Sequence, residues 1–320
     1  YLMKKRIIIS TGGTGGHIFP MIGLHDYLVS KNYDVLFTIN KRAKKYFRKK
    51  ILNKVKIFNI DSPFNKKNFS KILILPKLFL SLFSSFFFLL KNRPNLVIGS
   101  GGYASFPILM VSIFLRINFV LYETNSILGK TNKFFYFFSK KLLLGYNNSN
   151  ELPSKYQSKS YYVGQILRND FNKVSLNRYN NKKITILIMG GSQGANFFGE
   201  SLPEVFNHIN YLDIPLKIYH QSSKDQLEIV QNNYKDSFHE VEIFNFREDI
   251  YQLMEESDFA ITRAGSSSIS EMIAMQLPFI AIPMPKSLDN HQFYNADYFK
   301  RKDCCWLIEQ KDFRVDNFKK

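Results

Sequence analysis

Cysteine is almost absent from this sequence: only Cys304 and Cys305 occur among 320 residues, and they are neighbours. A disulfide between adjacent residues is strained, so none is expected here. Without further cysteines neither a disulfide framework nor a thiolate metal site can form. This usage is typical of a reducing cytosol. No signal peptide is expected either, because the first apolar run, residues 7–9, is too short to be its core.

Long apolar runs are missing as well. The longest, residues 72–90, is broken by Pro76 and Lys77, and only residues 78–90 are continuous. A membrane span needs about 20 apolar residues, so this run is too short to cross a bilayer. Two interpretations stay open: a buried core helix, or a helix that packs one face on a sheet and offers Phe and Leu to the bilayer. Basic residues flank the run and favour the second: Lys66, Lys67, Lys71, Lys91 and Arg93.

Acidic residues are scarce in one half of the chain only. Residues 1–163 hold 26 Lys and Arg against 5 Asp and Glu, a net charge of +21, whereas residues 164–320 hold 18 against 21, a net of −3. A lysine-rich coding bias would have raised both halves alike. Nucleic acid or an anionic membrane surface would explain a basic half. We expect the membrane, and no nucleic acid, because basic residues surround the apolar run.

Several catalytic signatures are also absent. No D-x-D sequence occurs, so a pair of carboxylates bridging Mg²⁺ is not evident, and no G-x-S-x-G sequence indicates a serine hydrolase. The glycine-rich stretches do not have the G-x-G-x-x-G spacing of a dinucleotide site, and the strand expected at residues 35–39 is not followed by an acidic residue that could bind a ribose. We expect neither a metal nor a cofactor.

What the sequence does contain is a glycine-rich stretch near its start, residues 10–20. It follows the apolar residues 7–9 and precedes a helix expected from about residue 19 to residue 30. Gly12, Gly13, Gly15 and Gly16 let the backbone turn and approach a ligand closely, and the start of a helix favours an anion. A plain strand-to-helix turn would need only one or two glycines. The pattern therefore favours binding of an anion or a sugar.

The same pattern recurs about 175 residues later. A strand expected over residues 182–189 leads into a second glycine loop, residues 190–194, and a helix over residues 195–209. Two such openings predict two doubly wound α/β domains, which we place at residues 1–163 and 164–320, with a polar linker at 172–181. Ligands of such sheets bind at the carboxyl ends of the strands. In the first domain, residues 12–17, 101–103 and Asn125 follow three strands and should line one edge.

The second domain contains a compact βαβ unit. A strand is expected over residues 258–262, a helix over 268–275 and a further strand over 278–283. Ser268 and Glu271 fit an S-x-x-E capping box, in which the carboxylate holds its own helix start. The alternative is that Glu271 accepts hydrogen bonds from sugar hydroxyls. The sequence leaves the two about even.

Two groups of side chains suggest chemistry. His17 lies at the mouth of the first glycine loop and can accept a proton near neutral pH, so it is the candidate general base; packing on neighbouring backbone is the alternative. The backbone amides of Ser192 and Gln193, together with Arg168, would offset the charge of a diphosphate. His220, at a strand end, is expected to order a loop and not to react.

These stretches resemble the MurG family of bacterial glycosyltransferases, which add N-acetylglucosamine from UDP-GlcNAc to lipid I to form lipid II. The resemblance rests on a series of segments in register along almost the whole chain: Gly12 to Pro20, Gly101-Gly102-Tyr103, Glu123-x-Asn125, Thr131-Asn132-Lys133, Gly190 to Ala195, His220-Gln221-Ser222, Arg263-x-Gly265, Ser270-Glu271, Leu277-Pro278, Pro283 and Asp289-x-His291-Gln292-x-x-Asn295-Ala296.

The resemblance implies a GT-B fold, in which two Rossmann-like doubly wound parallel-sheet domains face each other across a cleft, and an inverting transfer that needs no metal. His17 and Glu271 would be catalytic. The residues implied to contact UDP-GlcNAc are Thr14, Gly15, Gly16, Asn125, Arg168, Ser192, Arg247, Ser266, Ser267, Ser268, Ile269, Ser270, Glu271 and Gln292. Those implied to face the lipid I acceptor are Gly13, His17, Gly101, Gly102 and Tyr103.

Within this resemblance Glu271 would accept from the ribose hydroxyls, and Ser192 with Arg168 would meet the diphosphate. Residues 72–90 would be the membrane face of a peripheral protein on the cytoplasmic side of the bacterial inner membrane, with cell-wall or division proteins as candidate partners. The alternatives are another GT-B transferase acting on a glycolipid, a UDP-GlcNAc 2-epimerase, and a nucleotide-sugar-binding scaffold without turnover.

Some positions depart from the family pattern. Tyr122 and Thr124 replace the usual His and Gln ahead of Asn125, and residues 165–166 replace an Asn-Pro pair, which should leave that loop less rigid. Arg247 replaces an apolar residue near the uracil, and residues 266–268 are more polar than usual. The chain ends at Lys320, before the expected C-terminal helices, which implies either a fragment or a weakened domain closure.

Overall fold

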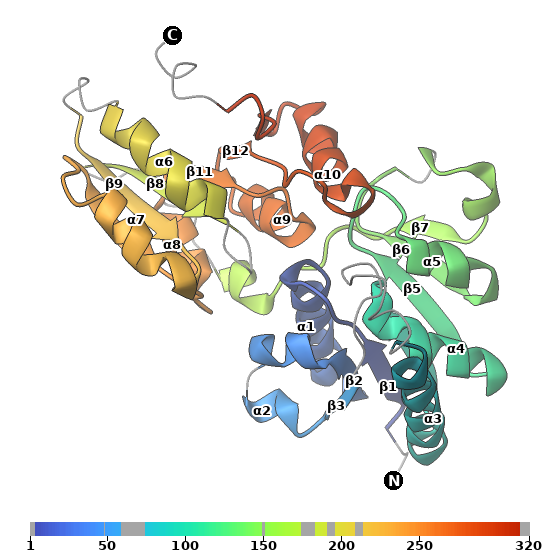
Figure 1. Cartoon of the computed structure of the whole chain (residues 1–320). Helices are drawn as coiled ribbons and strands as arrows, with labels where there is room; N and C mark the ends of the chain where they lie inside the picture. The colour runs from blue at the N-terminus through green and yellow to red at the C-terminus, as the bar shows by residue number, and fades with distance from the viewer. Residues whose placement is uncertain are drawn as a thin grey trace. The chain divides into compact units, whose positions relative to one another are not determined.

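The computed structural model describes residues 4–47, 49–58, 74–148, 151–173, 183–190, 196–208 and 214–313. The chain divides into two compact units, Tyr1–Arg168 and Asn169–Lys320. Each unit is a parallel sheet flanked by helices (Figure 1). The expected residues of the second glycine loop after Gly190, and nearly all of the expected linker, lie outside the described ranges.

Unit 1 contains a parallel sheet whose strands follow the order β3-β2-β1-β4-β5-β6-β7 among the described residues. Their bounds are β1 Arg6–Ser10, β2 Asp34–Asn40, β3 Val55–Phe58, β4 Leu96–Gly99, β5 Phe119–Glu123, β6 Lys141–Leu144 and β7 Ser160–Tyr162. The central strands read as continuous apolar runs because helices cover both faces of a parallel sheet. Ile8 and Ile9 of β1 face the two separate cores on either side of it.

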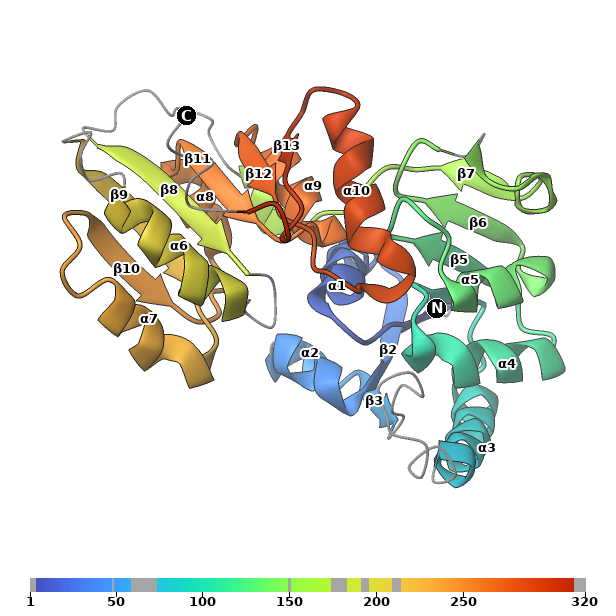
Figure 2. The same cartoon turned by 45° about the horizontal axis from the view of Figure 1, so that its top comes forward.

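The helical elements of unit 1 are α1 Gly15–Ser30, η1 Lys41–Tyr46, α2 Lys49–Leu52, α3 Ile74–Asn92, η4 Tyr103–Ser105, α4 Phe106–Phe114, α5 Lys130–Phe135, η5 Tyr136–Phe138, η7 Ser154–Tyr156 and, following in unit 2, η8 Asn169–Lys173. Helix α1 packs on one face of the sheet. Helices α3, α4 and α5 share the core on the other face, as Figure 2 shows.

One expectation for these helices is wrong. Helix α1 begins at Gly15, about four residues earlier than expected, and Pro20 lies inside it. Proline is most common in the first turn, so the sequence pointed to a start beside Pro20. Although Pro76 and Lys77 interrupt the apolar run in sequence, the helix does not stop there, since α3 includes both and Pro76 is its third residue. At that position the missing N–H group has no helical partner to lose.

Unit 2 contains a second parallel sheet, ordered β10-β9-β8-β11-β12-β13 among its described residues. The bounds are β8 Ile184–Met189, β9 Leu216–Gln221, β10 Glu240–Phe244, β11 Phe259–Thr262, β12 Phe279–Ala281 and β13 Trp306–Leu307, the last of which we did not expect. The helical elements are α6 Asn196–His208, η10 Lys224–Gln226, α7 Leu227–Asn233, α8 Ile250–Glu256, α9 Ser266–Ala274, η11 Leu288–Asn290 and α10 His291–Lys300.

The capping-box interpretation of Glu271 is wrong. Helix α9 begins at Ser266, two residues before the expected start, so that Ser268 is a helical residue and not the cap. Gly265 occupies the N-cap position, and no side chain caps the helix there. A carboxylate three residues beyond Ser268 therefore cannot close the expected capping box, and the burial of Glu271 needs another reason.

Among the described residues, no helix combines the length and the apolar character required to cross a bilayer.

Candidate functional site

The first group of candidate residues lies at the carboxyl edge of the unit 1 sheet. Strands β1, β4 and β5 are neighbours in that sheet, and each ends at one of the loops expected to bind ligand. The side chain of Ser100, after β4, donates to Oγ1 of Thr11, after β1, over 2.7 Å. The structure therefore brings together the three loops that the sequence placed at one edge.

At Gly12 and Gly13 the first glycine loop has a backbone that other residues could not adopt without a clash or strain. A Cβ atom on Gly12 would lie 2.4 Å from Cβ of Ala104, and Gly13 adopts a φ of +90°, which side chains other than glycine rarely allow. The amide of Ala43 donates to Oδ1 of Asn40 over 3.2 Å, and the amide of Gly13 lies 3.5 Å from the same oxygen. Asn40 is an organising residue that we did not single out, although an Asn ending the adjacent strand was a usable signal.

Thr14 is the N-cap residue of α1, followed by Gly15, Gly16 and His17 in the first turn. The Thr14 side chain makes no capping hydrogen bond, and no acidic side chain occupies the first turn. The amide groups at the start of this helix therefore face the loop with the positive end of the helix dipole, an arrangement that favours an anion. His17 Nδ1 lies 3.3 Å from Oγ1 of Thr124, which is on the loop after β5.

The loop after β4 contains Gly101, Gly102 and Tyr103. Both glycines have positive φ angles, +77° and +71°, so the backbone enters η4 in a conformation that suits glycine. The hydroxyl of Ser105 donates to the carbonyl oxygen of Gly101. Partial burial raises the pKa of the Tyr103 hydroxyl, which therefore stays protonated and can donate or accept a hydrogen bond near neutral pH.

Asn125 is held by a carboxylate to which we had assigned no role. Glu123 is buried and accepts four hydrogen bonds at 2.8–3.1 Å, two on each oxygen. The donors on Oε1 are the backbone and side-chain amides of Asn125, and those on Oε2 are the amide of Gly129 and the side chain of Asn132. The E-x-N spacing was the available signal for this cluster. It shapes the loop that carries Thr124 and Asn125.

Arg168 ends unit 1, where its guanidinium lies 4.6 Å from the ring centre of Phe19 on α1. Its side chain is buried, and stacking on an aromatic ring is a common way for arginine to be oriented. Ser192 and Gln193, expected to act with Arg168 on a diphosphate, lie outside the described residues. Their joint role stays a prediction.

The second group of candidate residues lies at the start of α9, where β11 ends. Ser266, Ser267, Ile269, Ser270 and Glu271 are buried, and Ser268 is partly exposed. The Ser270 hydroxyl donates to the carbonyl oxygen of Ser266, so Ser270 has a hydrogen-bond partner within its own helix. This first turn and a half lies at the carboxyl edge of the unit 2 sheet, where ligands of doubly wound sheets bind.

Arg263 anchors the loop between β11 and α9 to neighbouring segments of unit 2. Its guanidinium donates to the carbonyl oxygens of Ile282 and Pro283 at 3.1 and 3.2 Å and to Oε1 of Gln310 at 2.8 Å. It also lies over the ring of Phe198, 4.8 Å away. Burial lowers its pKa to about 10, so the group is still charged near neutral pH. The sequence flagged Arg263 in a motif, and the structure gives it an anchoring role.

Gln292 and Arg247 are the remaining residues of unit 2 that we expected to contact UDP-GlcNAc. Oε1 of Gln292 accepts from the amide of Met284 over 2.8 Å, which ties α10 to the segment after β12. Arg247 follows the edge strand β10 and pairs with Asp249 at 2.9 Å and Glu242 at 3.3 Å. Three strand spacings separate β10 from β11, about 14 Å. Arg247 therefore follows a different strand from the one that leads into α9, at the same edge of the sheet.

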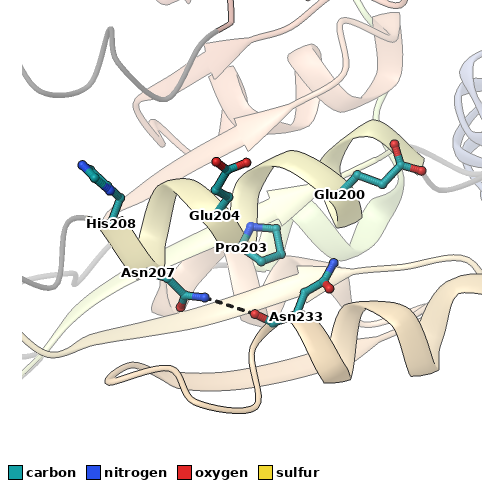
Figure 3. A pocket seen from close by; sticks show the side chains of 6 residues that line it. All are labelled: Glu200, Pro203, Glu204, Asn207, His208 and Asn233. Carbon is teal, nitrogen blue, oxygen red and sulfur yellow. Dashed lines mark hydrogen bonds between the residues drawn. The ribbon is translucent and has the colours of Figure 1, made fainter.

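A surface pocket of about 430 Å³ occurs elsewhere in unit 2, between α6 and α7 (Figure 3). The side chain of Asn207 donates to the carbonyl oxygen of Asn233 across it, over 3.1 Å. Its lining residues are Glu200, Pro203, Glu204, Asn207, His208 and Asn233. None of these is a residue that the sequence placed in a site, and we do not assign the pocket a role.

Within the part of the chain that the structure describes, no three His, Cys, Asp or Glu side chains are placed to hold a metal ion together.

Two parallel-sheet α/β units of seven and six strands are the architecture of GT-B glycosyltransferases, and comparison with known proteins identifies the chain as one of them. Residues 7–144 match the glycosyltransferase family 28 N-terminal domain, and residues 185–320 match the family 28 C-terminal domain. The crystal structure of Acinetobacter baumannii MurG superposes with a TM-score of 0.74 at 25% identity, covering 98% of this chain and 88% of that one.

The chain belongs to glycosyltransferase family 28, as a member of its MurG group. A protein of Pelagibacter ubique is 36% identical over 97% of this chain and 86% of its own length, and one of Rickettsia bellii is 34% identical over 96% and 87%. Both are named UDP-N-acetylglucosamine–N-acetylmuramyl-(pentapeptide) pyrophosphoryl-undecaprenol N-acetylglucosamine transferase. A UDP-GlcNAc 2-epimerase of Neisseria meningitidis, with a TM-score of 0.62 at 13% identity, shares the fold alone.

Proposed function

We propose that this glycosyltransferase moves N-acetylglucosamine from UDP-GlcNAc to undecaprenyl-pyrophosphoryl-MurNAc-pentapeptide, lipid I, and so forms lipid II. The observation that carries the proposal is that relatives covering nearly all of this chain at 34–36% identity are named for this transfer. Among the described residues, the loops after β1, β4, β5 and β11 that would contact donor and acceptor lie at the carboxyl edges of their sheets. A transferase acting on another glycolipid would need the same donor loops, so the acceptor is what the experiment must test.

On the donor side, the start of α9 would hold the uridine. Glu271 is a buried carboxylate in the second turn of that helix, and a carboxylate is a strong acceptor for a pair of ribose hydroxyls. Gln292 would contribute from α10, and Arg247 from the loop after β10. The leaving diphosphate would be stabilised by Arg168 and the amides of the second glycine loop, since fixed donors aimed at developing charge lower the barrier.

On the acceptor side, His17 would act as the general base. It would take the proton from the acceptor hydroxyl while that oxygen attacks the anomeric carbon of N-acetylglucosamine. The bond from this carbon to the diphosphate oxygen breaks, and UDP leaves with the electron pair, so the configuration inverts. Gly13, Gly101, Gly102 and Tyr103 would surround the diphosphate of the acceptor with backbone amides and a phenol.

Helix α3 supports a peripheral place on the membrane. Its buried side carries Ser81, Ser85 and Leu89, whereas phenylalanine and leucine side chains point outward: Phe79, Leu80, Phe83, Phe86, Phe87 and Leu90. The inward side also carries Leu82 and Phe88, so α3 packs on the core and still exposes more large apolar side chains than an ordinary surface helix does. The alternative of a helix buried on all sides does not fit these exposures.

The proposed membrane face extends beyond α3. Phe114 at the end of α4, and Phe134, Phe137 and Phe138 of α5 and η5, are also exposed and belong to helices on the same face of the sheet. Lysines and arginines lie close to them in the sequence: Lys77, Lys91, Arg93, Arg116, Lys130, Lys133 and Lys140. Apolar side chains with a cationic rim suit an anionic leaflet. The cytoplasmic face of the inner membrane would supply both this leaflet and lipid I.

Transfer of labelled N-acetylglucosamine from UDP-GlcNAc to a short-chain lipid I analogue tests the proposal. The assay would contain EDTA and would compare the wild type with His17→Ala and Glu271→Ala. We expect the wild type to turn over in EDTA. His17→Ala should mainly lower kcat and Glu271→Ala should mainly weaken donor binding, each by at least about tenfold.

The outcomes separate the alternatives. Donor binding without transfer in the wild type would favour a nucleotide-sugar-binding scaffold, and release of the 2-epimer of the sugar would favour an epimerase. If a different glycolipid is glycosylated and the lipid I analogue is not, the proposed acceptor is wrong. Absence of donor binding would contradict the assignment of α9 and Gln292.

A further inference from the structure

Thr124 lies between the candidate base and the segment that leads out of unit 1. Its hydroxyl oxygen is 3.3 Å from Nδ1 of His17, although 107 residues separate the two along the chain. Its carbonyl oxygen accepts from Nε2 of Gln165 over 3.0 Å. The side chain is almost completely buried, with 1% exposure. Thr124 therefore contacts His17 on one side and residue 165 on the other.

The position of Thr124 is fixed by its neighbours on both sides. Before it, the buried Tyr122 hydroxyl donates to the carbonyl oxygen of Gly164 and accepts from the amide of Ile166, both at 3.1 Å. After it, Asn125 is bound to Glu123 through two hydrogen bonds. Threonine is stiff at χ1 because it is branched at Cβ. The hydroxyl is thus held in one place against the imidazole ring.

Gln165 and Ile166, which we expected to leave their loop less rigid than an Asn-Pro pair would, both make hydrogen bonds to the end of β5. The amide of Ile166 donates to Tyr122, a bond that a proline at this position could not make. Gln165 adds the bond to Thr124, and its side chain also fills the space beside Gly145, where a Cβ atom would lie 2.5 Å from Nε2 of Gln165. The segment is bound to the end of β5 by three hydrogen bonds.

A hydroxyl beside Nδ1 can donate to that nitrogen or accept from it, and the direction sets which imidazole nitrogen is basic. When Thr124 Oγ1 accepts a hydrogen bond from Nδ1–H, the lone pair of the neutral ring is on Nε2, the nitrogen that can then take a proton. Two charged residues are close in sequence to Thr124 and Gln165. Glu123 accepts hydrogen bonds from Asn125, Gly129 and Asn132. Arg168 lies over the ring of Phe19.

We propose that Thr124 is a positioning residue that holds His17 in the Nδ1–H tautomer, with Gln165 keeping Thr124 in place. The proposal rests on the proposed function only in that His17 is the base. Its effect on the ring itself is independent of turnover. Loss of the oxygen that accepts from Nδ1–H would remove a contact that favours this tautomer and stabilises the protonated ring.

The test is ¹⁵N NMR of the full chain labelled at its histidines, with the signal of His17 identified from a His17→Gln sample. The chain has six histidines, so the spectrum is simple. In the wild type we expect the neutral ring to carry its proton on Nδ1. In Thr124→Val the tautomer should become mixed and the pKa of His17 should fall, whereas Thr124→Ser, which keeps the oxygen, should behave like the wild type.

Kinetics supply the second readout. In Thr124→Val, kcat should fall by about threefold to tenfold, the usual effect of one lost hydrogen bond, and the acid limb of its pH profile should move to lower pH. Thr185→Val, the same change at a buried threonine of β8, is the matched control and should leave both unchanged. Gln165→Leu should give a smaller shift in the same direction as Thr124→Val.

An unchanged tautomer and pKa in Thr124→Val would overturn the proposal, as would a wild-type ring protonated on Nε2. The spectra decide this without any turnover. A wild type that binds UDP-GlcNAc and transfers nothing would contradict the proposed function, and the ring spectra would still support or overturn the role of Thr124.

Discussion

Gly12 shows how a single missing side chain shapes the first glycine loop. Its Cα faces Ala104 on η4 and the side chain of Asn40, with no space for a methyl group. The close approach of the loops after β1 and β4 therefore depends on the size of two residues that are 92 positions apart in the sequence. The sequence suggested that glycine here would allow contact with a ligand, whereas at Gly12 it allows contact with the protein itself.

We predict that Gly12→Ala destabilises unit 1 by about 1–3 kcal/mol, the usual cost of overpacking, and lowers transfer activity. The double variant Gly12→Ala/Ala104→Gly should recover part of the stability, because it removes the atom that lies 2.4 Å from the new Cβ. Urea denaturation followed by circular dichroism would measure both. Equal instability of the single and double variants would contradict the steric explanation.

His220 is a second residue whose role depends on burial. Its ring is fully buried, Nδ1 lies 3.0 Å from the hydroxyl oxygen of Tyr234, and burial lowers its pKa to about 3. Burial also raises the pKa of the Tyr234 hydroxyl. A histidine that stays neutral in the folded protein is unsuited to proton transfer near neutral pH, in agreement with its expected role in ordering structure.

The lowered pKa of His220 predicts acid sensitivity. The unfolded chain binds a proton at His220 near pH 6.5, whereas the folded protein does not until about pH 3. The free energy of unfolding should therefore fall as the pH drops from about 6.5 toward 3. His220→Gln should be less stable at neutral pH and lose less stability in acid. Urea midpoints measured across this range test it, with the exposed His208 changed to Gln as the control. Equal acid sensitivity in the wild type and His220→Gln would contradict the prediction.

At the scale of single elements, α3 and α9 are the helices whose surroundings matter most. Helix α9 has no side-chain cap, and its first turn is largely buried at the carboxyl edge of its sheet. Helix α3 packs serines inward and leaves phenylalanines outside. In both cases polar side chains occupy part of the buried side. Such patterns are expected where an element binds something other than its own core.

For α3 we predict that Phe83→Ser/Phe87→Ser lowers binding to anionic lipid vesicles by at least about tenfold, since each large apolar side chain contributes about 1.5–3 kcal/mol when fully buried. The two side chains are 58% and 54% exposed, so the melting temperature should change little. Flotation with vesicles measures the binding. Ile229→Ser/Phe238→Ser, two exposed apolar residues of unit 2, is the matched control. Undiminished flotation of the α3 variant would rule out this face.

At the scale of the whole molecule, charge divides the chain along almost the same line as the structure does. The basic excess falls in residues 1–163, and the first compact unit ends at Arg168. A strongly basic unit would concentrate the protein near anionic lipid, and the apolar side chains of α3 would then add a contribution that salt does not screen.

These two contributions predict a partial salt dependence. Raising the ionic strength from about 0.1 M to about 1 M shortens the Debye length from about 10 Å to about 3 Å, so binding to anionic vesicles should weaken markedly. Binding should not disappear, because apolar contacts are unaffected by screening. Titration with vesicles at both salt concentrations measures this, with uncharged vesicles as the control. Insensitivity to salt would argue against the basic unit as a membrane contact.

Much of the fold could be predicted from local pattern alone. The strands β2, β8, β11 and β12 lie within about two residues of their expected positions, because buried parallel strands are short apolar runs bounded by turn residues. The errors occur where local pattern is ambiguous. Proline inside α1 suggested a later start, the serines before Glu271 suggested a cap, and β13 has only two residues.

The candidate site was predicted less evenly. Residues that act through the backbone, such as Gly13, Gly101 and Gly102, were recognisable because few residues other than glycine adopt their φ angles. The residues that hold the site together were not recognised. Asn40 and Glu123 are ordinary polar residues in sequence, and their importance comes from the donors that the fold brings to them.

The sequence by itself determined the class of the protein: two glycine loops, their strands and a basic first half follow from residue type and spacing. Tertiary structure alone decided which residues meet. Thr124 contacts His17 and Arg263 reaches Gln310 because of the order in which the strands pair and the loops fold back. Contacts between distant residues are set by this packing, whereas composition and local periodicity depend only on neighbours along the chain.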